Sequence, residues 1–127
     1  MTTDKKILIV EDDHKLSQML LDMFAAEGIG VMRASNGEEG LAIATEEHPD
    51  IILLDIILPK MDGITMLNKL REDEWGKSAD VIMLTNLSTA EDVHKATEAG
   101  AYDYLIKSDW KMADVVKKVK DKLGMSE

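Results

Sequence analysis

Short apolar runs alternate with helical patterns five times along the chain. The runs predict strands at Lys6–Val10, Ile29–Ala34, Asp50–Leu54, Ala79–Leu84 and Ala101–Ile106. Four of these segments are unbroken apolar stretches, which are typical of strands buried on both faces of a sheet. A parallel sheet has this property because the helices that connect its strands cover both faces.

The residues between the strands have the spacing of amphipathic helices. The first helix is predicted from an apolar stripe formed by Leu16, Leu20, Met23 and Phe24, and the last from one formed by Met112, Val115, Val116, Val119 and Leu123. Three further helices are expected near Gly37–Glu47, Gly63–Glu74 and Thr89–Ala99. Strands that alternate with such helices require right-handed crossovers. The fold class is therefore α/β, a (βα)5 doubly wound sheet of five parallel strands with helices on both faces.

Capping residues stand at the helix ends that this pattern predicts. Helix starts are expected at Asp13, at Asn36 and at Ser88 or Thr89, and helix ends at Gly28 and Gly100. Asp13 is the last of three consecutive acids, and acids also favour helix N-termini on electrostatic grounds.

The composition fits one compact domain that spans residues 1–127. The chain is 45% hydrophobic and 31% charged, and it holds only eight Gly and two Pro, so disorder is disfavoured. It has no cysteine, which excludes disulfides and thiolate metal sites and suits a cytoplasmic protein. No apolar run approaches the roughly 18 residues of a membrane span. The net charge of −10 disfavours direct contact with nucleic acid or anionic lipid.

Polar residues stand close behind four of the predicted strands. Asp12, Asp55, Thr85 and Lys107 follow apolar runs, and Glu11 adds a third carboxylate. Parallel strands gather their carboxyl ends at one edge of the sheet, where such sheets bind ligands. Each residue alone is more commonly a helix cap, a turn residue or a solvated charge. Their joint occurrence at four strand ends favours a site for phosphate and metal chemistry.

The residue types at these strand ends indicate which chemistry to expect. Three carboxylates repel one another unless a cation lies between them, and Mg²⁺ typically takes carboxylates, water and a phosphoryl oxygen. Zinc is disfavoured because the three histidines have no ligand spacing. Asp55 is the candidate nucleophile, since a carboxylate can form an aspartyl phosphate. Thr85 could donate a hydrogen bond to a phosphoryl oxygen, and Lys107 could neutralise another.

Four segments carry a resemblance to a known family. They are Ile7-Leu8-Ile9-Val10-Glu11-Asp12-Asp13, Leu53-Leu54-Asp55-Ile56-Ile57-Leu58-Pro59-Lys60-Met61-Asp62-Gly63, Met83-Leu84-Thr85 and Gly100-Ala101-Tyr102-Asp103-Tyr104-Leu105-Ile106-Lys107. On these motifs the chain resembles the receiver domain of bacterial two-component response regulators, from Lys5 to about Gly124. The resemblance implies the strand order 2-1-3-4-5. We expect a single receiver domain without an effector domain, which is either a standalone protein or part of a longer one.

The resemblance also implies roles for the site residues. Asp55 is then the phosphoacceptor, Glu11 and Asp12 form the acid pair, and Asp12, Asp55 and the backbone carbonyl of Ile57 bind Mg²⁺, with Glu11 beside them. Asp13 falls outside the acid pair and caps the first helix. The phosphoryl donor is a histidine kinase or a histidine phosphotransfer protein. The domain would catalyse its own phosphorylation and dephosphorylation, without being a turnover enzyme in the ordinary sense.

In the family, phosphorylation is coupled to a switch between a hydroxyl and an aromatic residue. Thr85 and Tyr104 occupy these positions, and the fourth helix and fifth strand would present a changed surface to a protein target. We expect a monomer, or a weak dimer through the face formed by the fourth helix, fifth strand and fifth helix.

Three positions beside the site are expected to tune its rates. A fourth position differs from the family pattern in a way that affects a peptide bond. Asn86 is bulkier than the small residue usual after the threonine, while Ile57 and Leu87 occupy variable rate-tuning positions. Ser108 replaces the usual proline after Lys107. A cis bond before a residue other than proline costs about 2.5 to 4 kcal/mol, so we expect the Lys107–Ser108 bond to be trans.

Three other functions are compatible with parts of the pattern. A pseudo-receiver, acting as an interaction module without phosphorylation, is disfavoured because every acidic, hydroxyl and ammonium position is intact. A small-molecule phosphatase or phosphotransferase commonly has a second aspartate two residues after the nucleophile, where this chain has Ile57. A flavodoxin-like flavin carrier would place a glycine- or hydroxyl-rich phosphate loop after the first strand, where three acids stand instead.

Overall fold

The computed structural model describes residues 4–85, 90–101, 103–106 and 111–124. Five strands form one parallel sheet in the order β2-β1-β3-β4-β5. The strands are β1 (Lys6–Val10), β2 (Gly30–Ala34), β3 (Ile51–Asp55), β4 (Val81–Thr85) and β5 (Asp103–Ile106). The helices are α1 (His14–Ala26), α2 (Gly37–Glu47), α3 (Gly63–Arg71), α4 (Ala90–Glu98) and α5 (Met112–Lys122), with a short 3-10 helix η1 at Gly76–Ser78. The predicted α/β class and strand order are confirmed.

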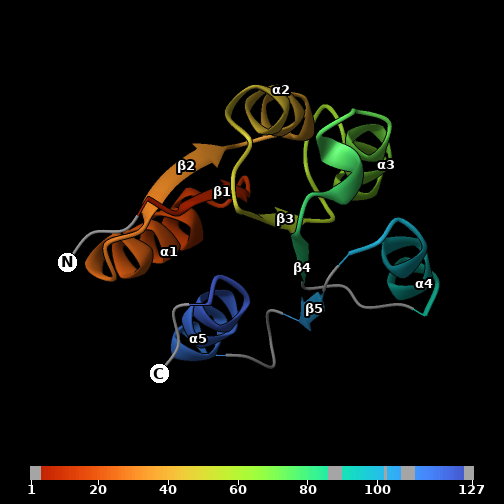
Figure 1. Cartoon of the computed structure of the whole chain (residues 1–127). Coiled ribbons are helices and arrows are strands. Elements are labelled where there is room, and N and C mark those ends of the chain that lie inside the picture. The colour runs from red at the N-terminus through yellow and green to blue at the C-terminus, as the bar shows by residue number, and fades with distance from the viewer. Residues whose placement is uncertain (1–3, 86–89, 102, 107–110, 125–127) are drawn as a thin grey trace.

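Helices cover both faces of the sheet (Figure 1), and alternate residues of β1 pack against opposite faces. On β1, Leu8 and Val10 belong to the cluster with α2 and α3, whereas Ile7 and Ile9 belong to the cluster with α1 and α5. All four are fully buried. Burial of each such side chain stabilises the fold by roughly 1.5 to 3 kcal/mol. The unbroken apolar runs of the sequence are therefore explained by burial on both faces.

Side-chain caps begin the helices that flank the first strands. The Asp13 carboxylate accepts the Leu16 N–H at the start of α1, and the Asn36 side chain accepts the Glu39 N–H at the start of α2. Both caps were predicted. Gly28 and Gly100 follow helices with φ of 79° and 81°, as expected for glycines at helix ends. The predicted cap at Ser88 or Thr89 lies outside the described residues.

The third helix is shorter than predicted. It ends at Arg71 instead of Glu74, because the Asp73 carboxylate accepts the backbone N–H groups of Trp75 and Gly76 and forms a turn. The 3-10 helix η1 follows this turn. Trp75 in this segment stacks on His48 at the end of α2, with ring centroids 4.5 Å apart. Among the described residues, no helix is long and apolar enough to cross a membrane.

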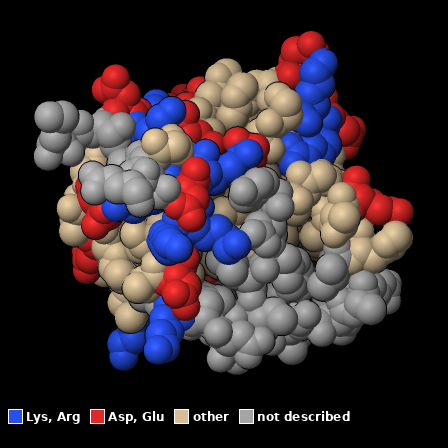
Figure 2. Space-filling view, turned by 60° about the horizontal axis from the view of Figure 1, so that its bottom comes forward, with Lys and Arg blue, Asp and Glu red and all other residues tan. Residues whose placement is uncertain are grey.

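Charges of both signs are interspersed on the face that α5 helps to form (Figure 2). Lysines of α5 make ion pairs there: Lys120 with Glu27, and Lys122 with Asp80 at 3.6 Å. The excess of acids in the whole chain therefore does not make this face uniformly negative.

Candidate functional site

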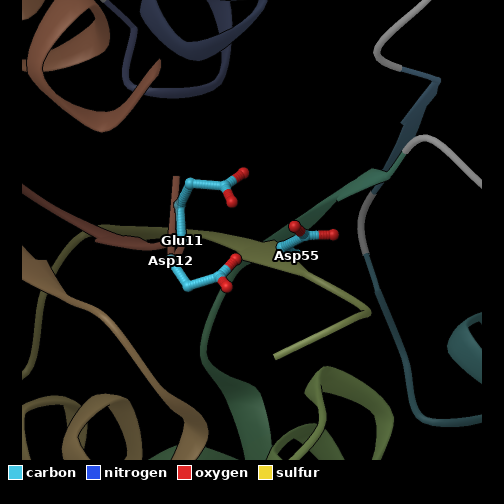
Figure 3. Close-up of side chains that lie close together, drawn as sticks. All are labelled: Glu11, Asp12 and Asp55. Carbon is cyan, nitrogen blue, oxygen red and sulfur yellow. The ribbon is translucent and has the colours of Figure 1, made fainter. Parts of the chain in front are cut away.

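Three carboxylates meet at the carboxyl edge of the sheet (Figure 3). Glu11 and Asp12 follow β1, and Asp55 is the last residue of β3, the strand that pairs with β1. One oxygen from each of the three carboxylates lies within 4.8 Å of the others. Glu11 and Asp55 are 2% and 5% exposed, whereas Asp12 is exposed. The acid cluster predicted from the sequence is thus assembled by the strand register.

The acid cluster has the donor set of a hard divalent cation. Two unit charges at that separation repel each other by on the order of 3 kcal/mol at an effective dielectric constant of about 20. A cation that binds all three groups would offset this repulsion. Carboxylate oxygens, water and phosphoryl oxygens are the ligands that Mg²⁺ prefers, and the side chains in the cluster offer only carboxylate oxygens. The cluster therefore fits Mg²⁺.

Local hydrogen bonds fix the acid pair and exclude Asp13 from it. The Glu11 N–H continues the sheet by donating to the Ala34 carbonyl at 3.0 Å, and a Glu11 carboxylate oxygen accepts the Asp13 N–H at 3.1 Å. The Asp13 carboxylate turns to the start of α1, where it caps the Leu16 N–H at 3.1 Å. Asp13 therefore caps α1, as predicted, and is not among the acids of the cluster.

The loop from Asp55 to α3 is held close to the acid cluster. An Asp55 carboxylate oxygen accepts the Ile57 N–H at 3.4 Å, and the Gly63 N–H donates to the Ile56 carbonyl at 2.8 Å. A Cβ on Gly63 would lie 2.0 Å from the Asp55 carbonyl oxygen, so only glycine fits there. Asp62 caps α3 by accepting the Thr65 N–H at 2.9 Å. Ile57 itself is 55% exposed.

The remaining predicted residues are described only in part. Thr85 ends β4, which pairs with β3, and Tyr104 lies in β5 opposite Met83. Their backbones therefore stand on the strands that the prediction required. Lys107, Asn86, Leu87 and Ser108 lie outside the described residues, and so does the predicted trans bond. The roles of all these residues stay predictions.

Two further residues near the loops were missed by the sequence analysis. Arg71 donates to the carbonyls of Gly76, Ala79, Ala99 and Gly100 and so joins the end of α3 to the turn after α4. Burial lowers the pKa of its guanidinium, and the neighbouring Asp80 carboxylate partly counteracts this. Gly37, expected only to begin a helix, packs against the Met61 carbonyl. Neither the contact of Arg71 with Ala99 and Gly100 nor that of Gly37 with Met61 has a signal in the sequence, because each joins segments that lie far apart in the chain.

Comparison with known proteins agrees with this geometry. The profile of the response regulator receiver domain matches residues 7–120. The chain belongs to this family. The receiver domain described here is 39% identical over 102 residues to the DNA-binding dual master transcriptional regulator RpaA of Synechocystis, a match that covers 80% of this chain and 42% of that protein. It is 34% identical to the DNA-binding response regulator MtrA of Mycolicibacterium smegmatis over 99% of this chain and 54% of the relative.

Solved structures of receiver domains have the same fold. A CheY-like receiver domain protein from Methanospirillum hungatei superimposes with a TM-score of 0.88 at 32% identity, over 96% of this chain and 95% of the other. The receiver domain of the sensor histidine kinase PA1611 from Pseudomonas aeruginosa, solved with a magnesium ion coordinated in its active-site cleft, superimposes with a TM-score of 0.85 at 28% identity, over 96% and 99% of the two chains. This chain spans about two fifths of RpaA, so it corresponds to one part of such a regulator.

Proposed function

We propose that this receiver domain accepts a phosphoryl group on Asp55 in a Mg²⁺-dependent reaction and thereby switches a surface that contacts a target protein. The observation that carries the proposal is the position of Asp55: it ends a buried strand of a receiver domain, with its carboxylate beside those of Glu11 and Asp12. The related receiver domain of PA1611, which coordinates magnesium in its active-site cleft, supports the metal requirement.

In the proposed reaction an Asp55 carboxylate oxygen attacks the phosphorus of a phosphohistidine. The new bond is O–P, the P–N bond breaks, and the electron pair stays on the imidazole nitrogen, which takes up a proton. When bound, Mg²⁺ would neutralise negative charge on the phosphoryl oxygens. Asp12, Asp55 and the Ile57 carbonyl are its proposed ligands, with Glu11 completing the acid pair. We assign one remaining phosphoryl oxygen to the Thr85 hydroxyl and another to the Lys107 ammonium.

The proposed partners are proteins. The donor is a histidine kinase or a histidine phosphotransfer protein in the cytoplasm. Movement of Thr85 toward the phosphoryl group would free space for the Tyr104 ring and change the surface of α4 and β5. A protein target fits better than DNA for this chain, since its net charge of −10 disfavours direct contact with a phosphate backbone.

The proposal is tested by incubating the protein with a small acyl phosphate and Mg²⁺ and measuring its intact mass. We expect one added phosphoryl group, which Asp55→Asn abolishes. Asp62→Asn is the matched control: it is an equivalent change in the same loop, and asparagine keeps the cap of α3. An unmodified wild-type mass, or equal phosphorylation of Asp55→Asn, would contradict the proposal and favour an interaction module without phosphorylation.

A further inference from the structure

The loop between Asp55 and α3 packs so closely against the start of α2 that no Cβ atom fits between them. A Cβ placed on Gly37, the first residue of α2, would lie 2.0 Å from the Met61 carbonyl oxygen and 2.8 Å from its carbon. Real Cβ contacts do not come below about 3 Å, so any side chain at position 37 would have to displace this peptide. Gly37 is buried. The absence of its side chain therefore decides how near to α2 the loop can lie.

The loop has little freedom to absorb such a displacement locally. Lys60 has a φ of 66°, which residues with a side chain rarely adopt. The Met61 N–H donates to the Pro59 carbonyl across Lys60 at 2.7 Å, which makes a three-residue turn. The far end of the loop is held where Gly63 packs on the Asp55 carbonyl. A displacement of the Met61 peptide would therefore also shift the earlier part of the loop, toward Ile57.

The first turn of α2 cannot easily move away instead. The Asn36 side chain caps it through the Glu39 N–H, and the Glu39 carboxylate accepts the Ser35 N–H at 3.0 Å in return. One turn later, a Cβ on Gly40 would lie 2.9 Å from both methyl groups of Val10, the residue before Glu11. The helix is thus packed tightly against the strand that carries the acid pair.

We propose that Gly37 is a positioning residue for the metal site. By admitting the Met61 carbonyl, it sets the position of the Ile57 carbonyl relative to the carboxylates of the acid cluster. A methyl group at position 37 would move the Ile57 carbonyl out of reach of a cation held by Asp12 and Asp55. The inference rests on the proposed function, in which the Ile57 carbonyl is a metal ligand.

The test is the dissociation constant of Mg²⁺, measured by calorimetric titration of the folded protein. We expect Gly37→Ala to raise this constant by about tenfold or more, equivalent to about 1.4 kcal/mol. The matched control is Gly76→Ala. A Cβ on Gly76 would lie 2.2 Å from the Leu70 carbonyl oxygen, so both variants lose stability through contact with a backbone carbonyl. Gly76 lies in η1, before β4 begins and away from the carboxyl edge, so its variant should bind Mg²⁺ within twofold of wild type.

The outcomes separate this inference from the proposed function. Wild-type affinity in folded Gly37→Ala overturns the inference alone, and so does an equal loss of affinity in Gly76→Ala. A wild-type protein whose Mg²⁺ binding is absent, or is unaffected by Asp12→Ala, overturns the proposed metal site and the inference together. Should Gly37→Ala fail to fold, the wild type provides a second test by NMR. The amide signals of Gly37 and Met61 should then shift with the same Mg²⁺ dependence as that of Ile57, and unmoved signals overturn the inference.

Discussion

Asp12 and Asp13 are adjacent acids in different surroundings. The Asp12 carboxylate lies within 4.8 Å of the carboxylates of Glu11 and Asp55, whereas Asp13 caps the N–H of Leu16. Substitution of Asp12 therefore removes a group from the acid cluster, while substitution of Asp13 by asparagine keeps the cap and leaves the cluster complete. This difference makes the metal requirement testable with one pair of variants.

We predict that Mg²⁺ binds weakly to the unphosphorylated protein and is required for its phosphorylation. The variant Asp12→Ala should bind Mg²⁺ with an affinity that is lower by about tenfold or more. The physical reason is the loss of one carboxylate from a cluster that needs a counter-cation. Calorimetric titration gives the affinities, and the rate of phosphorylation by a small acyl phosphate gives the activity, with Asp13→Asn as the control. Phosphorylation that runs equally fast in excess chelator would show the metal role to be wrong.

The side chain of Ile57 predicts a long-lived phosphoryl group. Ile57 is 55% exposed, its N–H donates to the Asp55 carboxylate, and its aliphatic side chain cannot orient an attacking water. Leu87, the other position expected to tune the rate, is also aliphatic. We expect the double variant Ile57→Asn with Leu87→Glu to lose its phosphoryl group about tenfold faster, equivalent to about 1.4 kcal/mol of barrier. Decay of the phosphoprotein in Mg²⁺ buffer measures both rates, and agreement within about twofold would refute the expectation.

At the scale of elements, the end of α3 is joined to two other segments by one side chain. Arg71 donates to carbonyls of η1 and its C-terminal neighbour, Gly76 and Ala79, and to carbonyls after α4, Ala99 and Gly100. No pattern of apolar residues predicts this contact, since its partners are backbone carbonyls, two from the segment that follows α3 and two from the distant turn after α4. The helix boundary at Arg71 was missed for a local reason, the turn in which the Asp73 carboxylate accepts the N–H groups of Trp75 and Gly76.

We predict that Arg71→Met lowers the free energy of unfolding by about 2 to 4 kcal/mol. The cause is the loss of charged hydrogen bonds and the partly buried carbonyls that remain without these donors. Urea denaturation measures the effect, and Lys69→Met, an exposed cation on the same helix, is the control. A loss in Arg71→Met that stays within about 0.5 kcal/mol of the control would mean that the four carbonyls are satisfied without the arginine.

For the whole molecule, the sequence predicted the sheet well because burial on both faces leaves unbroken apolar runs at β1, β3 and β4. The acid cluster was equally predictable, since Glu11 and Asp12 follow β1, Asp55 ends β3, and the register of these two strands brings their ends together. What could not be predicted depends on how distant loops approach each other. The contact between Gly37 and Met61 is of this kind, because nothing in the sequence of a helix start or of a loop indicates how close the two will lie in the folded protein.

Because strand residues alternate between the two faces of the sheet, the two core clusters contribute almost independently to the free energy of unfolding. Ile52 packs with α2 and α3, whereas Val119 packs with α1 on the other side of the sheet. Residues without shared neighbours have additive effects on unfolding, within about 0.5 kcal/mol. Ile52→Val and Val119→Ala should therefore give a double variant whose loss equals the sum of the single losses in a thermodynamic cycle. One face of the domain can then change its packing during evolution while the other keeps its own.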